Sequence, residues 1–351
     1  MKVLQELLGI ELPVIQAPMA GVQGSALAIA VSNAGGLGSL PCAMLSPDAM
    51  RKELAALRDG TDRPFNVNFF CHIQPTFDPE REAAWRKLLT PYYDEYGVTL
   101  PEPGGGPGRA PFDERAAELV EEFRPAVVSF HFGLPRRSLM GRVKAAGAVV
   151  LASATTVEEG IWLEEHGVDA VIAQGLEAGG HRGMFLTEDL ATQLGTYELL
   201  REMLPRVRVP VIASGGIVDA AGTRRAMEMG AAGVQAGTAY LLCLEATTSG
   251  LHRAAVASEA VRPTALTNLF SGRAARGKVN RMMRELGPMS DAVPAFPLAA
   301  AALARLRARA EGLGDDGFSP LWCGQNPSRG VGLDAADVTR ALVWDKSVKS
   351  M

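Results

Sequence analysis

Residues 209–238 have the sequence VPVIASGGIVDAAGTRRAMEMGAAGVQAGT, and the order of apolar runs, glycines and helical pattern in it indicates the class of fold. A short apolar run, Val209–Ala213, leads into two glycines, and a helical pattern, Ala220–Met229, ends at Gly230. A second apolar run, Gly233–Ala236, leads into another glycine. Short apolar strands that alternate with helices imply parallel pairing of the strands. The stretch therefore predicts one strand–helix–strand unit of an α/β fold.

The same alternation extends upstream through most of the chain. The expected strands are Val14–Met19, Leu37–Pro41, Phe65–Phe70, Ala126–Phe130, Ala148–Ala152, Ala170–Ala173, Val209–Ala213 and Gly233–Ala236. The expected helices are Ser25–Ala34, Pro47–Arg58, Phe112–Phe123, Arg136–Ala146, Val157–His166, Thr196–Leu204 and Ala220–Met229, with an eighth somewhere after Ala236. Eight such units predict a closed (β/α)8 TIM barrel. A doubly wound open sheet is the alternative, although no GxGxxG opens the first helix.

Two parts of the chain depart from this rhythm. Residues 71–110 contain the run Pro101–Gly108, PEPGGGPG, which can continue neither a helix nor a strand. We therefore expect an insertion after the third strand, with this run as an exposed loop. Residues beyond about 290 are expected to form an appendage of helices and loops, in which Pro297–Ala310 is an amphipathic surface helix.

Composition excludes several classes of protein. The chain of 351 residues is 47% hydrophobic and 21% charged with a net charge of −4 and no basic stripe, which argues against nucleic-acid binding. The cysteines are far apart and form no CxxC pair, so we expect reduced thiols, no metal site and no disulfide framework: Cys42, Cys71, Cys243 and Cys323. No signal peptide and no membrane-spanning run is visible, so we expect a cytoplasmic protein.

Small turns follow the seventh and eighth strands. They are Ser214-Gly215-Gly216-Ile217 and Gln235-Ala236-Gly237-Thr238. Barrels of this kind often hold a phosphate at these two loops, because small residues let backbone N–H groups approach its oxygens. The two turns together predict a phosphate site. Either one alone is weak evidence, because a glycine pair after a strand is usually just a turn. Asp219, just beyond, is expected to be a helix N-cap.

Polar side chains follow three other strands. The loop Gln174–Gly183 carries His181 and Arg182 between glycines, so His181 is a candidate acid or base, and Arg182 pairs with an anion, with Glu177 or with solvent. His131 ends the fourth strand and is either functional or a packed core residue. Asn68, in the third strand, is either a ligand contact or a satisfied core amide.

Several of these segments resemble the nitronate monooxygenases, formerly called 2-nitropropane dioxygenases. The likeness rests on LGIELPVIQAPM (8–19), the Asn68 strand, Ser129–Gly133, Ala173–Gly183, Ala213–Ile217, Gly233–Thr238 and Ser271–Arg276. The phrase EAGGHRG, residues 177–183, is the most specific part. The Ser-Phe-His-Phe-Gly run points to the group, class I, that acts on propionate 3-nitronate and other alkyl nitronates.

The resemblance implies a barrel, residues 1–240, that binds FMN, and a segment, residues 241–351, that completes the barrel and covers the active site. The insertion and this segment would form a smaller substrate domain. FMN would contact Met19, Asn68, Gln174, Gly179, Gly180, Ser214, Gly215, Gly216, Gln235, Ala236, Gly237 and Thr238. His181 would be catalytic, with His131 beside it. The enzyme would oxidise nitronates with O2 to aldehyde or keto products and nitrite, without a metal, as a monomer or homodimer.

Other functions fit the same scaffold. An FMN-dependent NAD(P)H oxidoreductase, either an enoyl-acyl carrier protein reductase or a quinone reductase, would share the Gly-Gly-His loop. A non-catalytic flavin- or phosphate-binding protein and a barrel isomerase or lyase for a phosphorylated sugar are further alternatives. Near the end of the chain, LWCGQN (321–326) is unusually aromatic and polar, and we expect Trp322 or Gln325 to fold back toward the flavin.

Overall fold

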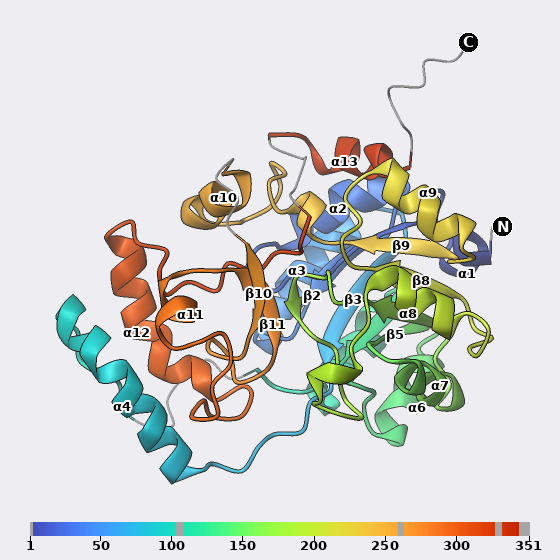
Figure 1. The fold of residues 1–351 in the computed structure, drawn as a ribbon. Coiled ribbons are helices and arrows are strands. Elements are labelled where there is room, and N and C mark those ends of the chain that lie inside the picture. The colour runs from blue at the N-terminus through green and yellow to red at the C-terminus, as the bar shows by residue number, and fades with distance from the viewer. Residues whose placement is uncertain (1–2, 103–108, 259–262, 327–331, 344–351) are drawn as a thin grey trace.

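The computed structural model describes residues 3–102, 109–258, 263–326 and 332–343. Eight parallel strands form a nearly closed barrel surrounded by helices (Figure 1), so the predicted barrel is confirmed. In barrel order the strands are β1 (Val14–Gln16), β9 (Gly233–Ala236), β8 (Val211–Ser214), β6 (Ala170–Gln174), β5 (Val149–Ala154), β4 (Val127–His131), β3 (Phe65–Phe70) and β2 (Gly38–Pro41). At the seam between β1 and β2, the Leu37 N–H donates to the Val14 carbonyl at 2.9 Å.

The predicted outer helices are also present, with ends within two residues of those expected. They are α2 (Ser25–Asn33), α3 (Pro47–Gly60), α5 (Glu114–Phe123), α6 (Arg137–Ala145), α7 (Val157–Glu165), α8 (Thr196–Met203) and α9 (Ala220–Glu228). Side-chain N-caps begin several of them, as expected from their sequences. The predicted cap at Asp219 is confirmed, because its carboxylate accepts the Gly222 N–H at 2.9 Å.

The amino-terminal end of the barrel is filled by apolar side chains. The short helix α1 (Val3–Leu8) places Leu4 and Leu8 against Ile15 and Ile212 of the strands, and all four are buried. Burial of this apolar surface stabilises the closed end. Because that end is packed, a ligand enters from the opposite end, where the strands carry their carboxyl termini.

The eighth helix of the barrel comes from the end of the chain. A 3-10 turn, η2 (Thr238–Tyr240), follows β9, and the position beside α2 is taken by α13 (Ala335–Ala341). The Tyr240 hydroxyl and the Thr339 hydroxyl are hydrogen-bonded at 3.0 Å. The barrel is thus completed by residues nearly one hundred positions after its last strand. The expected division of the chain into a barrel, residues 1–240, and a following segment, residues 241–351, stays a prediction.

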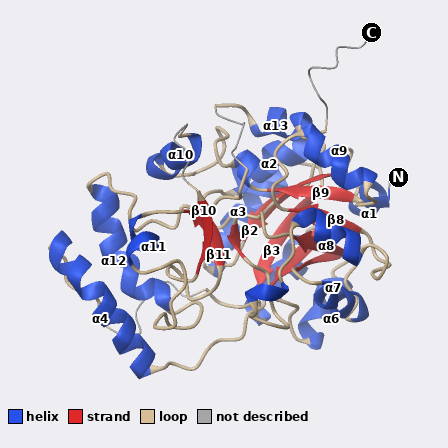
Figure 2. Ribbon diagram, viewed as in Figure 1, coloured by secondary structure: helices blue, strands red, loops and turns tan. Residues whose placement is uncertain are grey.

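A second lobe stands beside the barrel (Figures 1 and 2). It contains α4 (Pro79–Tyr96), α10 (Gly250–Ala257), α11 (Arg281–Glu285), α12 (Ala299–Gly312) and the strands β10 (Thr264–Thr267) and β11 (Ala275–Lys278). The insertion helix α4 packs along α12, and the two share a core that includes Trp85, Leu89 and Leu303. The expected surface helix is therefore confirmed as α12, whereas the sequence patterns do not predict α4. Of the Pro101–Gly108 run, residues 103–108 lie outside the described ranges.

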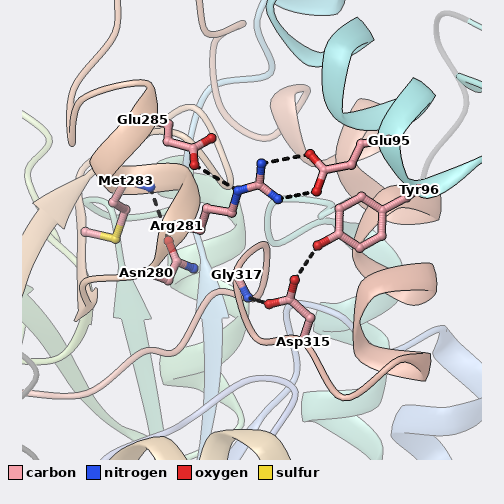
Figure 3. Close-up of polar contacts among 8 residues, drawn as sticks. All are labelled: Glu95, Tyr96, Asn280, Arg281, Met283, Glu285, Asp315 and Gly317. Atoms are coloured by element: carbon pink, nitrogen blue, oxygen red, sulfur yellow. Dashed lines mark hydrogen bonds and ion pairs between the residues drawn. The ribbon is translucent and has the colours of Figure 1, made fainter.

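An arginine joins α4 to α11 (Figure 3). The Arg281 guanidinium makes two hydrogen bonds to the Glu95 carboxylate, at 2.6 and 2.8 Å, and one to Glu285 at 2.8 Å. The Tyr96 hydroxyl donates to Asp315 in the loop after α12. These contacts fix the insertion to the carboxyl-terminal part of the lobe, so the two parts form one body.

Three further observations concern the described residues alone. No helix among them is long and apolar enough to cross a membrane, and the expected cytoplasmic location stays a prediction. No group of three or more His, Cys, Asp or Glu side chains in these ranges is arranged to hold a metal. The four cysteines are unpaired thiols, as predicted.

Candidate active site

A cavity opens at the carboxyl ends of the barrel strands. Its volume is about 290 Å³, whereas one water needs roughly 10–15 Å³, so the cavity has room for an organic ligand. Every residue predicted for the site lines it: Met19, Asn68, His131, Gln174, Gly179, Gly180, His181, Ser214, Gly215, Gly216, Gln235, Ala236, Gly237 and Thr238. The fold therefore brings all the predicted side chains to one place.

One end of the cavity is formed by the two glycine-bearing loops after β8 and β9. The backbone φ angles of Gly215 and Gly216 are +127° and +68°, values that residues with a side chain rarely adopt. Within the described part of the chain, the N–H groups of Gly216, Gly237 and Thr238 donate to no protein acceptor. The buried Gln235 Oε1 likewise has no partner there. Unused donors beside a strand end are what an anionic group such as phosphate requires.

Two residues that sequence reasoning missed hold this end in place. The Thr196 hydroxyl donates to the Gly215 carbonyl at 3.0 Å, and Thr196 N–H donates to the Glu177 carboxylate at 2.8 Å, at the start of α8. A threonine at the first position of a helix is a possible sequence signal for Thr196, since polar side chains often bond the free backbone groups of a first turn. No local pattern shows that Glu177, nineteen residues earlier, reaches it.

The predicted return of the segment 321–326 to the cavity is observed for Trp322, which lines it, but not for Gln325. The Gly324 N–H donates to the Thr238 hydroxyl at 2.8 Å, and Gln325 N–H donates to the Glu177 carbonyl at 3.0 Å. A Cβ added at Gly179 would lie 2.4 Å from the Cys323 carbonyl carbon. Gly179 therefore has to be a glycine, because the returning segment touches its backbone.

The loop after β6 is held by a buried arginine. Arg182 donates to the carbonyls of Gln174 and Gly175, both at 2.6 Å, and to the Gln193 amide oxygen at 2.8 and 3.0 Å. The expected pairing of Arg182 with an anion, with Glu177 or with solvent is therefore wrong, since these hydrogen-bond partners are neutral. Burial lowers the pKa of Arg182 to about 10, so it keeps its charge near neutral pH.

The same loop forms a two-residue strand, β7 (Gly180–His181), that pairs antiparallel with β11. His181 lies opposite Ala275, so the candidate catalytic residue is held between the barrel and the second lobe. The His181 carbonyl accepts from Gln174 Nε2 at 3.0 Å and is 3.3 Å from His131 Nε2. The Gln174 Oε1 accepts the Gly183 N–H at 2.8 Å. The loop is thus rigidly placed.

Ser271 is the hydrogen-bond partner of His181 Nε2. The Ser271 hydroxyl lies 2.9 Å from Nε2 and 3.3 Å from the Arg273 carbonyl, so its one proton serves either the imidazole or the carbonyl. When the hydroxyl donates to the carbonyl, the imidazole donates through Nε2 and its lone pair is on Nδ1, which has no hydrogen-bond partner in the described ranges. Nδ1 is therefore available to accept a proton.

Three histidines gather around an aromatic cluster. The ring centre of Phe296 lies 4.9 Å from that of His72 and 5.4 Å from that of His181, and Phe132 lies 4.5 Å from His131. Burial lowers the pKa of His131 to about 3 and that of His72 to about 4. Burial, followed by the charge of Arg109, lowers the pKa of His181 well below its usual value. All three imidazoles are neutral at pH 7.

On the opposite wall, Asn68 reaches the cavity from β3. Its amide nitrogen donates to the Ser129 hydroxyl at 2.9 Å, and Asn66, deeper in the barrel, donates to the same hydroxyl at 2.9 Å. Asn68 Oδ1 accepts no hydrogen bond from the described residues. Asn68 is thus both a bonded core amide and a cavity residue, which combines the two alternatives drawn from the sequence.

Met19 is held by a glutamine that sequence reasoning also missed. Gln23 Oε1 accepts the Met19 N–H at 2.9 Å, and the Gln23 amide nitrogen donates to the Ser39 carbonyl at 2.6 Å. The loop after β1 is therefore fixed to β2 with Met19 against the cavity. Gln23 stands in the sequence within a Gly- and Ser-rich turn, which gives no signal of this role.

Comparison with known proteins identifies the family. The family model for nitronate monooxygenase (NMO) matches residues 1–337. Relatives named nitronate monooxygenase come from Paraburkholderia phytofirmans, 42% identical over 97% of this chain and 94% of that protein, and from Pseudomonas aeruginosa, 43% identical over 96% and 97%. The crystal structure of nitroalkane oxidase from Streptomyces ansochromogenes superposes with a TM-score of 0.88 at 37% identity, covering 97% and 96% of the two chains. The chain therefore belongs to the nitronate monooxygenase family, a flavin-dependent class of oxidoreductase enzymes.

Proposed function

We propose that the protein is an FMN-dependent monooxygenase that oxidises alkyl nitronates, propionate 3-nitronate among them, with O2 to aldehyde or keto products and nitrite. The observation that carries this proposal is one cavity with two chemically different ends. Unused backbone donors lie at the loops after β8 and β9, and neutral His181 lies at the other wall with a free Nδ1. A phosphate-bearing cofactor and a small acidic substrate are the pair of ligands that such a cavity suits.

The residues present fit FMN. Gly216, Gly237 and Thr238 would hold the phosphate through N–H groups that have no protein acceptor in the described ranges. A Cβ added at Gly180 meets nothing within 4 Å, so the backbone there is open for close approach by a flat ring. The unpartnered Gln235 Oε1 and the Asn68 amide would supply further polar contacts. When bound, the flavin supplies the one-electron chemistry that links the substrate to O2.

His181 acts on the substrate from a fixed position. Its lone pair on Nδ1 accepts the carbon-bound proton of a neutral nitroalkane, because the ring is neutral and Nε2 is already committed to Ser271. Once protonated, the imidazolium is attracted to the anion that has formed. A substrate offered as the nitronate has no such proton, so for that substrate the ring only binds and orients. His131 supports the arrangement through the His181 carbonyl, at 3.3 Å.

The test is a visible spectrum of the purified, FMN-loaded protein under anaerobic conditions, with propionate 3-nitronate added to one sample and NADH to another. The expected result is a change in the flavin spectrum with the nitronate and none with NADH, and nitrite release when air is admitted. Bleaching by NADH without a response to nitronate would make the enzyme an NAD(P)H oxidoreductase. A protein that cannot be loaded with FMN would refute the cofactor assignment. Size-exclusion chromatography decides between the monomer and the expected homodimer.

A further inference from the structure

The cavity has an arginine that nothing in the described structure neutralises. The Arg109 side chain lines the same cavity as His181, and its guanidinium carbon lies 5.5 Å from the centre of the Phe296 ring. Over the described ranges this guanidinium has no hydrogen-bond acceptor and no carboxylate partner. A guanidinium has five N–H donors in a fork that matches a carboxylate. Arg109 thus presents unused positive donors beside the candidate catalytic histidine.

Buried arginines elsewhere in the described part of the chain have hydrogen-bond acceptors. Arg182 is bonded to two carbonyls and an amide, and Arg276 to the Leu176 carbonyl and the Thr264 hydroxyl. Arg273, on the far side of the aromatic cluster, donates to the Met184 carbonyl. A cation that is removed from water without a partner is costly. Arg109 is the exception among these, and a ligand that brings its own negative charge would remove the cost.

The position of Arg109 relative to His181 limits what that ligand is. The His181 ring centre lies 5.4 Å, and the Arg109 guanidinium carbon 5.5 Å, from the same Phe296 ring centre. Both groups thus adjoin one aromatic ring and line one cavity, and after burial the charge of Arg109 is the largest influence on the pKa of His181. A single small molecule in that cavity could contact both. Burial, followed by the charge of Arg307, lowers the pKa of Arg109, and no described carboxylate raises it. Glu311, which also lines the cavity, is paired with Arg307.

We propose that Arg109 is a specificity-determining residue that binds a carboxylate on the substrate, at the end away from the nitro group. This inference rests on the proposed function and adds to it the residue that distinguishes nitronates with a second acidic group from those without one. The substrate would place its nitronate carbon toward His181 and its carboxylate toward Arg109. An alkyl nitronate without a carboxylate would leave the guanidinium unused.

The experiment compares two substrates of equal carbon number in the FMN-loaded enzyme. Propionate 3-nitronate carries the carboxylate, and propyl-1-nitronate does not. We expect Arg109→Met to lower kcat/KM for propionate 3-nitronate by about 10- to 100-fold, mainly through KM, because a hydrogen-bonded charge pair is lost. The value for propyl-1-nitronate should stay within about threefold of wild type. Arg109→Lys should recover part of the loss, since it keeps the charge without the fork.

A matched control is Arg305→Met on α12. Arg305 is exposed, donates to the Thr99 carbonyl and is not among the residues that line the cavity. Both substrates should be turned over by this variant as by wild type. Equal losses for both substrates in Arg109→Met, or no loss for either, would overturn the assignment. A lysine variant no better than the methionine variant would also overturn it.

Calorimetric titration with succinate separates this inference from the proposed function. Succinate has two carboxylates separated by the same number of carbons as the acidic groups of propionate 3-nitronate, and its binding needs no turnover. Wild type should bind it, and Arg109→Met should bind it about tenfold or more weakly. If neither nitronate is oxidised but this difference is found, the monooxygenase proposal fails and the anion site stands. If Arg109→Met binds succinate as tightly as wild type does, the assignment of Arg109 as the carboxylate-binding residue is refuted.

Discussion

His72 should contribute to the sensitivity of the fold to mild acid, and replacing it should remove that contribution. The side chain is 4% exposed, and neither ring nitrogen has a hydrogen-bond partner in the described ranges. Burial lowers its pKa from 6.5 to about 4. Between pH 6.5 and pH 4, His72 is therefore protonated in the unfolded chain but not in the folded chain. The stability of the fold is full above pH 6.5 and is lost as the pH falls toward 4.

The magnitude follows from the two pKa values. Between pH 7 and pH 5 the linkage relation gives a loss of about 2 kcal/mol from this one residue. His72→Leu removes the titration, and the Arg109 backbone carbonyl beside the imidazole keeps the hydrogen bond that it accepts from Gln74 Nε2 at 3.2 Å. At pH 7 we expect the free energy of unfolding to be unchanged or slightly raised, since the cost of burying two unbonded nitrogens disappears.

Urea unfolding of wild type and His72→Leu at pH 7 and pH 5 measures the effect. The difference between the two pH values should be smaller in the variant by about 2 kcal/mol, whatever the substitution does to packing. His166→Gln, at an exposed histidine that ends α7, is the control and should keep the wild-type difference. An equal loss of stability in wild type and His72→Leu would show that His72 does not carry the acid sensitivity.

Three further predictions concern the site. His181→Asn should retain FMN but lower the turnover of neutral nitroalkanes by about 10²- to 10⁴-fold, as expected for loss of a general base. Steady-state oxygen consumption measures this turnover. An unchanged rate would assign the role of the base to His131. Ser271→Ala should lower kcat/KM for a nitroalkane by roughly tenfold or more, because removal of the carbon-bound proton needs the tautomer that Ser271 favours. For the pre-formed nitronate, kcat/KM should stay within about threefold of wild type. Equal effects on both substrates would contradict this role of Ser271. Gly179→Ala should lower the free energy of unfolding by about 1–3 kcal/mol, since the new methyl overlaps Cys323, whereas Gly141→Ala in α6, with open space around its Cβ, should be neutral or stabilising by up to about 1 kcal/mol in the same urea experiment.

The barrel and the residues of the cavity are predictable because they depend on short-range patterns. Apolar runs such as Val209–Ala213 identify strands, and strand ends of one barrel meet at one face, so the sequence alone is enough to bring Gly215, Gly237 and His181 together. The features that the sequence does not predict depend on contacts distant along the chain. The helix α4 contains Pro91, which usually ends a helix, and its stability comes from packing on α12, about two hundred residues later.

Partners of polar groups are similarly hard to predict. The sequence favours an acid or solvent beside Arg182, but its partners are carbonyls of its own loop and the side chain of Gln193, which are set by how the loop turns back on itself. The pairing of β7 with β11 involves two residues on each side, too few to leave an alternating pattern. The contact of the 321–326 segment with Gly179 and Thr238 joins residues more than eighty positions apart in the chain.

The packing of α13 on α2 has a consequence for the time at which the protein becomes functional in the cell. These two helices are about three hundred residues apart in the chain, and the ribosome adds roughly 5–20 residues per second. The first helix of the barrel therefore waits on the order of 15–60 s for its neighbour to be made. During that interval the face of α2 that carries Val31 lacks α13, and the wall of the cavity formed by Trp322 does not yet exist. The last wall of the candidate cavity is therefore made only when synthesis of the chain is nearly complete.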